Sequence, residues 1–249
     1  MKKICPDVKN SICNWRLFAG ILVLFCTALF SAQDQVKQLL TVRFSEVPGW
    51  FSAFCFFADH PNTLMVIPIA APFVFAAEIE EDFRSRYVLF VCARIDRRQY
   101  YTGKILGLMF SGGFVVCGAM LLLLFTACLG FDQVTWIQEN GEGMLIFYGR
   151  FILYLVCGFL NGALWALIGG LAALASHSIY AAYAFPFVLY YVLSIFQERY
   201  YGSALFLSPR YWATPFSSLG IGSIGILLLL FSAVAAAFVF VIKKRLERI

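Results

Sequence analysis

Six apolar runs, separated by short polar segments, constrain the fold of this chain more than any other feature. Each run approaches or exceeds the about 20 residues that a helix needs to cross a bilayer. The predicted spans cover residues 17–32, 64–83, 105–130, 151–175, 179–196 and 219–242. Because 61% of the residues are hydrophobic and only 13% are charged, a soluble fold could not bury the apolar surface. The sequence therefore predicts an all-α, polytopic integral membrane protein with about six transmembrane helices, forming one domain over residues 1–249.

The first run is the shortest, and a cleavable signal peptide is the alternative to a retained helix. Lys2 and Lys3 precede the run, and small residues end it at Ser31 and Ala32. A signal peptide has a short basic leader and small residues at both cleavage positions. Because Asp7 lies in a long leader and Phe30 interrupts the small residues, we expect the helix to be retained.

The basic side chains predict the orientation of the spans. Of the 19 lysines and arginines, 14 lie in the N-terminal segment, the loop between the second and third runs, and the C-terminal tail. Basic residues in short loops are retained on the cytoplasmic side. We therefore expect both termini and residues 84–104 to be cytoplasmic, in a multi-pass protein of the plasma membrane. The net charge of +5 then reflects topology rather than nucleic-acid binding.

The eight cysteines do not predict a disulfide framework. Most of them lie within apolar runs or on the expected cytoplasmic side, where thiols stay reduced. A bridge between Cys55 and Cys128, both near the expected outer surface, is the alternative.

Two aromatic segments lie between apolar runs on the expected outer side. Residues 47–57 contain Trp50 and four phenylalanines, and such rings favour the membrane interface. They predict an interfacial helix, with a substrate-contacting lid as the alternative. Residues 200–216 contain Pro209 and Pro215 and predict a broken, partly re-entrant segment.

The densest charge pattern lies at residues 77–104, which read AEIEEDFRSRYVLFVCARIDRRQYYTGK. If residues 84–98 are helical, four apolar side chains share one face and the arginines project elsewhere. The four are Val88, Val91, Cys92 and Ile95. The simplest interpretation is a helix along the inner headgroups whose arginines bind anionic lipid.

Lipid binding by the arginines leaves the preceding carboxylates unexplained. These are Glu78, Glu80, Glu81 and Asp82. At a cytoplasmic helix end they oppose both the helix dipole and the anionic leaflet, so they need nearby cations. Arg84 and Arg86, or the arginines at 94–98 folding back, are the expected partners. The pattern predicts an organised polar elbow that would suit a docking surface.

These features resemble the permease subunits of ATP-binding-cassette (ABC) exporters of the type-2 class. The matching features are an acidic end of span two, a short amphipathic stretch, an Arg-x-Asp-Arg-Arg-x-x-Tyr-like element at residues 94–101, and Gly103-Lys104 opening span three. Six spans, internal termini, an amphipathic leader and the re-entrant outer segment also match, so the resemblance covers nearly the whole chain. In that family, the loop between spans two and three contains a coupling helix that docks into a separate ATPase subunit.

The resemblance implies roles for particular residues. Coupling to the ATPase would fall to Arg94, Ile95, Asp96, Arg97, Arg98, Tyr100 and Lys104. The carboxylates Glu78, Glu80 and Glu81 would support this element. The leader, residues 7–16 with Ile12 and Trp15 as apolar anchors, would touch the ATPase as well. The tail, residues 243–249, receives no role beyond topology.

No motif for nucleotide binding, metal binding or nucleophilic catalysis occurs in the sequence. Gly103-Lys104 lacks the earlier glycine and the following hydroxyl residue of a phosphate-binding loop. His60 and His177 are each isolated. We therefore expect a chain that is not an enzyme and holds no cofactor or metal, with ATP and Mg²⁺ bound by the partner ATPase.

Inside the spans, the main polar residue is Asn161. Gly158, Gly162 and other small residues nearby permit close helix packing, while a substrate pathway or dimer interface at Asn161, Gly158 and Gly162 is the alternative. Pro68 and Pro72 should kink span two. The span centres hold no ionisable residues, which disfavours a secondary transporter.

The resemblance implies a permease subunit of an ABC exporter that moves an amphipathic or hydrophobic cargo, such as a peptide, a lipid-like or a drug-like compound. Its expected partners are an ABC ATPase subunit, a second permease of the same or a similar kind, and membrane lipid, but no nucleic acid. A membrane scaffold or sensor subunit and an ATP-independent secondary transporter are the alternatives. Co-purification of an ATPase would separate these classes.

Overall fold

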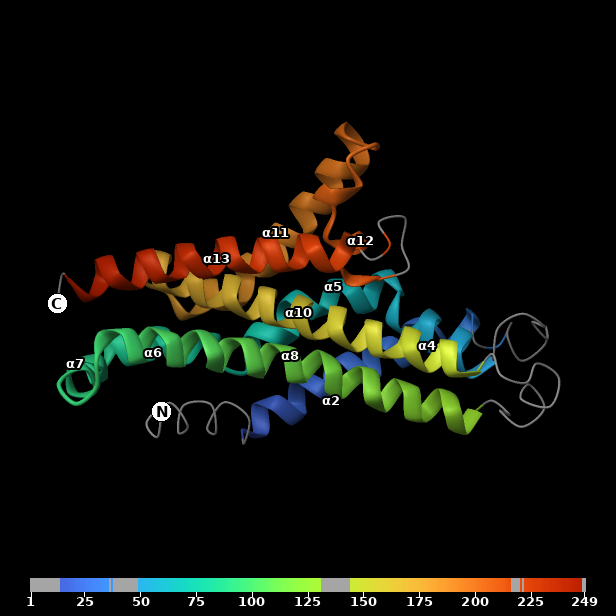
Figure 1. Cartoon of the computed structure of the whole chain (residues 1–249), viewed down its shortest axis with the longest axis horizontal. Helices are drawn as coiled ribbons and strands as arrows, with labels where there is room; N and C mark the ends of the chain where they lie inside the picture. Colours follow the sequence, from blue (N-terminus) through green and yellow to red (C-terminus); the bar gives the residue numbers. More distant parts are fainter. Residues whose placement is uncertain are drawn as a thin grey trace.

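The computed structural model describes residues 14–35, 37, 49–130, 144–215, 220 and 222–247, which form helices and turns and contain no β-strand. Figure 1 shows the elongated bundle, with α7 at one end and α4 towards the other. The elements are α2 (Trp15–Ser31), α4 (Gly49–Ala58), α5 (Pro61–Phe73), α6 (Ala76–Arg84), α7 (Tyr87–Cys92), α8 (Arg97–Gly130), α10 (Met144–Ser176), α11 (Ile179–Tyr200), the 3-10 turn η2 (Leu205–Leu207), α12 (Pro209–Ala213) and α13 (Gly222–Leu246).

Five helical segments are long and apolar enough to cross a membrane, which confirms an all-α, polytopic membrane architecture. They are Pro61–Arg84, Arg97–Gly130, Ile146–Ser176, Ile179–Tyr200 and Gly222–Leu246. The first predicted span corresponds to α2, which has 17 residues. A helix of that length extends about 26 Å, slightly less than the roughly 30 Å of the hydrocarbon core. A sixth crossing by α2 therefore stays a prediction.

The predicted span limits agree with the helices to within a few residues, except at the starts of α8 and α10. Those helices begin at Arg97 and Met144, whereas the predicted spans began near residues 105 and 151. A span predicted from hydropathy stops where charged residues begin, whereas the hydrogen bonds of a helix can continue through charged residues. The first two turns of α8 are accordingly helical and charged.

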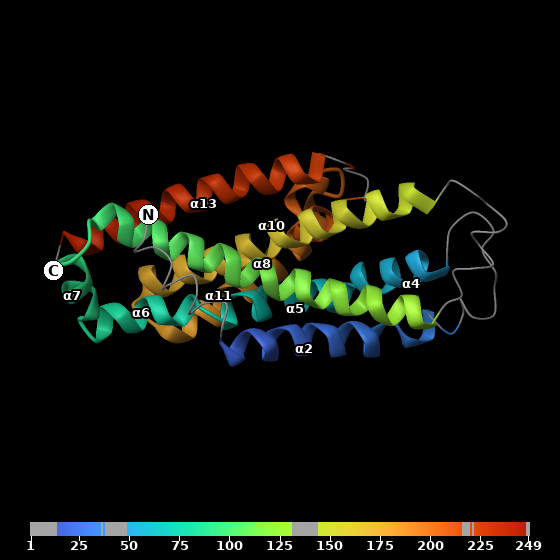
Figure 2. The ribbon, with the colours of Figure 1, turned by 60° about the horizontal axis from the view of Figure 1, so that its bottom comes forward.

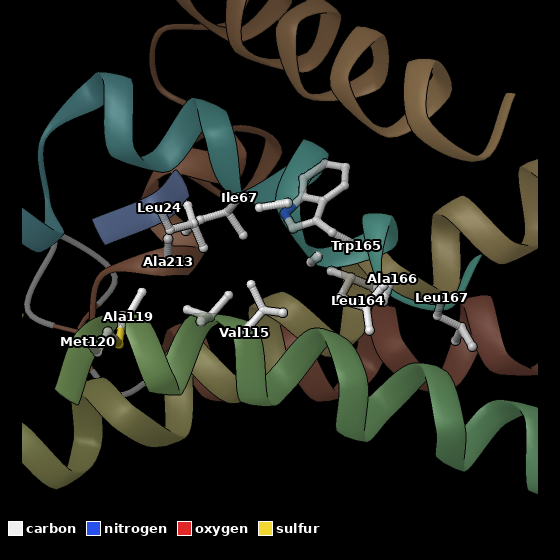
Figure 3. Close-up of a cluster of buried hydrophobic side chains, with 14 of the residues drawn as sticks. Leu24, Ile67, Val115, Ala119, Met120, Leu164, Trp165, Ala166, Leu167 and Ala213 are labelled. Atoms are coloured by element: carbon white, nitrogen blue, oxygen red, sulfur yellow. The ribbon is translucent and has the colours of Figure 1, made fainter. Parts of the chain in front are cut away.

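Helix α10 lies at the centre of the bundle and contacts α8, α13, α11 and α5. Figures 1 and 2 show α13 and α8 running along α10, with α2 beside α8, while α11 leans away towards its C-terminal end. The core joins these helices through Leu24 of α2, Ile67 of α5, Val115 of α8 and Trp165 of α10 (Figure 3). All four of these side chains are buried.

Helices α8 and α10 approach closely at Gly112 of α8 and Gly162 of α10. A Cβ atom at Gly162 would lie 2.3 Å from the carbonyl oxygen of Gly112, and one at Gly112 would lie 2.4 Å from that of Gly162. Since both obstacles are backbone atoms, no rotamer change could relieve the clash. The small residues predicted to allow close packing do so here within one chain.

We expect Gly162→Ala to destabilise the protein by about 1–3 kcal/mol, because α8 and α10 must separate to admit the methyl group. The measurement is the midpoint of thermal unfolding in detergent. Gly149→Ala is the matched control, since it lies on the same helix and no atom stands within 4 Å of its added Cβ. Equal midpoints for the two variants would contradict the close approach.

The two prolines of span two coincide with a break in the helix. Pro68 and Pro72 lie within α5, and the helix is interrupted at residues 74–75 before α6 begins at Ala76. Phe75, with a φ of −135°, is the residue that departs from helical geometry. A proline supplies no amide hydrogen for the helical ladder, which weakens the turns around it. The predicted kink is confirmed, and it separates the apolar α5 from the charged α6.

Both aromatic segments of the predicted outer side pack onto the bundle. The Phe54 ring of α4 lies edge-on to Phe151 and Tyr154 of α10, at centroid distances of 5.1 and 5.3 Å. A helix is thus confirmed over Gly49–Ala58, and its location at the membrane interface stays a prediction. Its buried rings are Trp50, Phe51, Phe54 and Phe57, whereas Phe56 is exposed. Residues 201–215 are broken into η2 and α12, as predicted, and the indole N–H of Trp212 donates to the carbonyl of Phe206 at 2.7 Å.

Among the described residues, no disulfide bond joins Cys55 to Cys128. The alternative of a bridge between these two residues is therefore not realised.

Candidate functional site

Helices α6, α7 and α8 form a charged elbow, defined here as residues 76–104, at one end of the bundle (Figure 1). The chain turns at Ser85, whose hydroxyl donates to the carbonyl of Glu81 at 2.8 Å. Arg86 follows with a φ of 59°, a left-handed conformation that stops α6 and redirects the chain into α7. A second turn at residues 93–96 leads into α8.

Residues 84–98 do not form one helix, because these two turns divide the segment. The predicted apolar face is nevertheless present. Val88 is buried, and Val91, Cys92 and Ile95 pack partly buried against the core. The apolar periodicity correctly identified the side chains that face the core. The left-handed turn could not be predicted, because it falls at Arg86 and not at a glycine, the residue that usually adopts a positive φ.

The carboxylate of Glu80 forms the most buried ion pair of the elbow, with Arg245 of α13. Two guanidinium nitrogens of Arg245 donate to the two oxygens of Glu80, one of them at 2.9 Å. Arg245 also donates to the carbonyl of Leu174 on α10 at 3.3 Å, and its guanidinium lies 4.3 Å from the centroid of the Phe83 ring. Glu80 is only 4% exposed. The pair therefore fastens the end of α13 to α6 and α10.

Asp82 pairs with Lys104 in a second buried contact, which joins α6 to α8. The Nζ atom of Lys104 lies 2.7 Å from Oδ2 of Asp82, and the hydroxyl of Tyr100 donates to the same oxygen at 3.4 Å. The Lys104 ammonium also lies 5.0 Å from the centroid of the Phe75 ring. A cation–π contact of this kind offsets part of the cost of burying the charge.

Glu78 approaches Arg16 of α2 at 4.0 Å, in a more exposed pair. The three carboxylates thus connect α6 to three different helices, α2, α8 and α13. The expected pairing with Arg84, Arg86 or the arginines at 94–98 was wrong. Those arginines lie exposed on the same continuous segment, whereas the actual partners come from helices far away in sequence. Glu81 is exposed as well.

The residues that the resemblance assigns to coupling divide into two groups in the structure. Tyr100 and Lys104 are buried and hold α8 against α6, so they are not available to a partner protein. Ile95 is half-buried. The exposed members are Arg94, Asp96, Arg97 and Arg98, and they continue from an exposed apolar surface on α7 formed by Tyr87, Leu89 and Phe90. Phe90 is 70% exposed. The leader lies outside the described residues except for its last three, which include Trp15.

Arg245→Ala should destabilise the protein by about 3–5 kcal/mol, because it leaves the buried charge of Glu80 without its partner. Thermal unfolding in detergent measures this effect, with the exposed neighbour Lys244→Ala as the control. Adding Glu80→Gln to Arg245→Ala should restore part of the loss, since the unpaired charge is then removed. A double variant no more stable than Arg245→Ala would contradict the pairing.

Asn161, Gly158 and Gly162 are all buried between helices of one chain. A Cβ atom at Gly158 would meet the sulfur of Met120 at 2.6 Å. These contacts agree with the packing role of the glycines, and a pathway or dimer role stays a prediction. The side-chain oxygen of Asn161 is buried and makes no hydrogen bond.

Sequence reasoning missed a half-buried aspartate, Asp59, near the opposite end of the bundle. Asp59 lies between α4 and α5, and its Oδ2 atom accepts a hydrogen bond from the hydroxyl of Tyr154 at 2.7 Å. Its Oδ1 atom is buried without a hydrogen-bond partner. Burial raises the pKa of Asp59 to about 6, although the hydrogen bond from Tyr154 opposes the shift. In the sequence, Asp59 resembles any loop residue, and only the packing of α4 reveals it.

The pKa of Asp59 predicts a pH-dependent stability. The folded protein holds this proton more tightly than the unfolded chain, so stability should fall as the pH rises from about 4 to above 6. Asp59→Asn should remove this dependence and raise stability above pH 7 by about 3 kcal/mol, because the amide avoids the buried charge. The measurement is the midpoint of thermal unfolding of the wild type and of Asp59→Asn, taken at intervals of about one pH unit from about pH 4 to about pH 8.

Asp34→Asn is the control for this experiment, since Asp34 is exposed and its carboxylate lies 3.4 Å from the ammonium of the exposed Lys37. A wild-type protein whose pH profile matches that of Asp59→Asn would contradict the burial of a charged carboxylate.

Comparison with known proteins identified no matching family model, no curated protein and no solved structure. The resemblance to type-2 ABC permeases therefore remains based on the sequence pattern. Among the described residues, no group of three or more histidine, cysteine or carboxylate side chains could hold a metal ion.

Proposed function

We propose that this protein is the membrane-spanning permease subunit of an ABC exporter, with six crossings, both termini in the cytoplasm and the charged elbow facing a separate ATPase subunit. The observation that carries the proposal is the construction of the elbow. Three of its carboxylates fasten α6 to α2, α8 and α13, while the apolar side chains of α7 stay exposed at the end of the bundle.

The exposed surface of α7 supports a docking role rather than a lipid-binding one. Leu89 and Phe90 project from a six-residue helix at the extreme end of the elongated bundle (Figures 1 and 2). They are flanked by the exposed Arg86 and Arg94. An apolar centre with a charged rim is typical of protein–protein interfaces. We assign the ATPase contact to α7 and the turn at residues 93–96, with Arg97 and Arg98 at its border.

The ion pairs would transmit a displacement of α7 to the spans. A buried ion pair resists separation, because parting its members leaves two uncompensated charges. Movement of the elbow by the ATPase would therefore carry the ends of α8 and α13 with it. Differential contacts of the ATPase with two arrangements of the elbow would then shift the permease between inward-facing and outward-facing states. The apolar, aromatic spans suit an amphipathic cargo.

Purification of the tagged chain from its native host should recover an ATPase subunit, and Phe90→Glu together with Arg94→Glu should abolish this recovery. Phe90→Glu would place a charge in the apolar centre of the contact, where it loses its hydration, and Arg94→Glu would reverse the charge at the rim. The measurement is the amount of ATPase per mole of permease. Lys244→Glu serves as the control, because it reverses an exposed charge on α13 outside α7 and the turn. Unchanged recovery with the double variant would overturn the assignment.

An ATP-independent, proton-linked transporter is the second candidate, and the buried Asp59 favours it. Ionisable residues at membrane depth often mark proton pathways. Asp59 precedes the span Pro61–Arg84 and accepts a hydrogen bond from Tyr154, so it would lie at the entrance of such a pathway rather than at its centre. Transport by the purified chain in vesicles, driven by a pH gradient without ATP or a partner, would favour this candidate over the exporter.

A further inference from the structure

A cavity of about 310 Å³ lies between the first turn of α8 and the last turn of α13, on the side of the bundle where these two helix ends meet. Its walls are Arg97, Arg98, Tyr101, Lys243, Leu246 and Glu247. The volume is at the lower end of the roughly 300–1,000 Å³ of small-molecule sites. A small polar group fits such a space.

The charge of the cavity selects an anion. Arg97, Arg98 and Lys243 supply three positive charges against the one carboxylate of Glu247. The neighbouring Arg245 does not line the cavity, and its guanidinium is paired with the carboxylate of Glu80. The 34-residue helix α8 begins at Arg97, so its first peptide N–H groups and the positive end of its dipole lie at the same place.

The position of the cavity favours a ligand of the headgroup layer. Lys243 follows the apolar length of α13, where basic side chains extend to the interface between lipid and water. Its ammonium lies 5.7 Å from the centroid of the Tyr101 ring, so the cation and the ring join the two walls. Leu246 and Tyr101 give the cavity an apolar wall beside its charges.

We propose that this cavity binds a phosphate group, carried by an anionic phospholipid or free in solution. Two arginines on consecutive residues and a lysine from the opposite wall are the donors that recognise phosphate oxygens. Glu247 can accept a hydrogen bond from a hydroxyl of a polyol headgroup such as that of phosphatidylglycerol. Bound phosphate would bridge α8 and α13 at the end where Arg245 already fastens α13 to α6.

The test uses the full chain in detergent and follows the midpoint of thermal unfolding, which rises when a ligand binds the folded state. One arm adds phosphatidylglycerol to mixed micelles and compares it with phosphatidylcholine, whose headgroup has no net charge. The other arm adds inorganic phosphate and compares it with chloride at equal ionic strength. No ATPase is needed, so the outcome does not depend on the exporter proposal.

The decisive variant is Arg97→Gln/Arg98→Gln/Lys243→Gln, which removes the three cations that line the cavity. The matched control is Arg84→Gln/Arg94→Gln/Lys244→Gln, which removes three exposed cations at the same end that do not line it. We expect the first variant to lose about fivefold in affinity for each cation removed, and the control to keep the wild-type response.

A rise with phosphatidylglycerol alone supports the proposal with lipid as the source, and a rise with inorganic phosphate as well supports it with a soluble source. The proposal is overturned if neither ligand raises the midpoint, if phosphatidylcholine acts as strongly as phosphatidylglycerol, or if both triple variants respond alike. Counting phosphatidylglycerol retained per mole of purified protein checks the result without reference to unfolding.

Discussion

The ion pair between Glu80 and Arg245 is the interaction on which the organisation of the charged end depends. It closes a contact between residues 165 positions apart and, through the carbonyl of Leu174, includes α10 as well. An uncompensated charge at this depth would be costly, so neither residue is tolerated there alone. The bidentate ion pair fixes the position of the end of α13 relative to α6.

Much of the fold follows from the sequence, because the membrane imposes helices of a defined length. The apolar runs predicted five long helices and the position of α2, and the prolines at 68 and 72 predicted the break in span two. What failed was the identity of the ion-pair partners. A local pattern shows that Glu80 needs a cation, but the choice of Arg245 depends on how α13 returns to the bundle.

The same limitation hid the group around Asp59. Its burial depends on α4 folding onto α10, and the aromatic residues that drive this contact were equally compatible with a headgroup location. Residue type therefore identified the side chains that become partly buried. Which helix buries them depends on the tertiary structure. The tail was assigned only a role in topology, yet Arg245 and Lys243 take part in two separate features of the charged end.

Because span two is interrupted at residues 74–75, α6 can tilt independently of α5. Its nine residues form a rigid arm of about 13 Å, hinged beside Phe75, whose ring contacts Lys104. A tilt of about 10° at this pivot would displace the far end of α6 by about 2 Å while leaving α5 in place. Force applied at α7 would thus reach α8 and α13 through their salt bridges before it reached the apolar half of the same span.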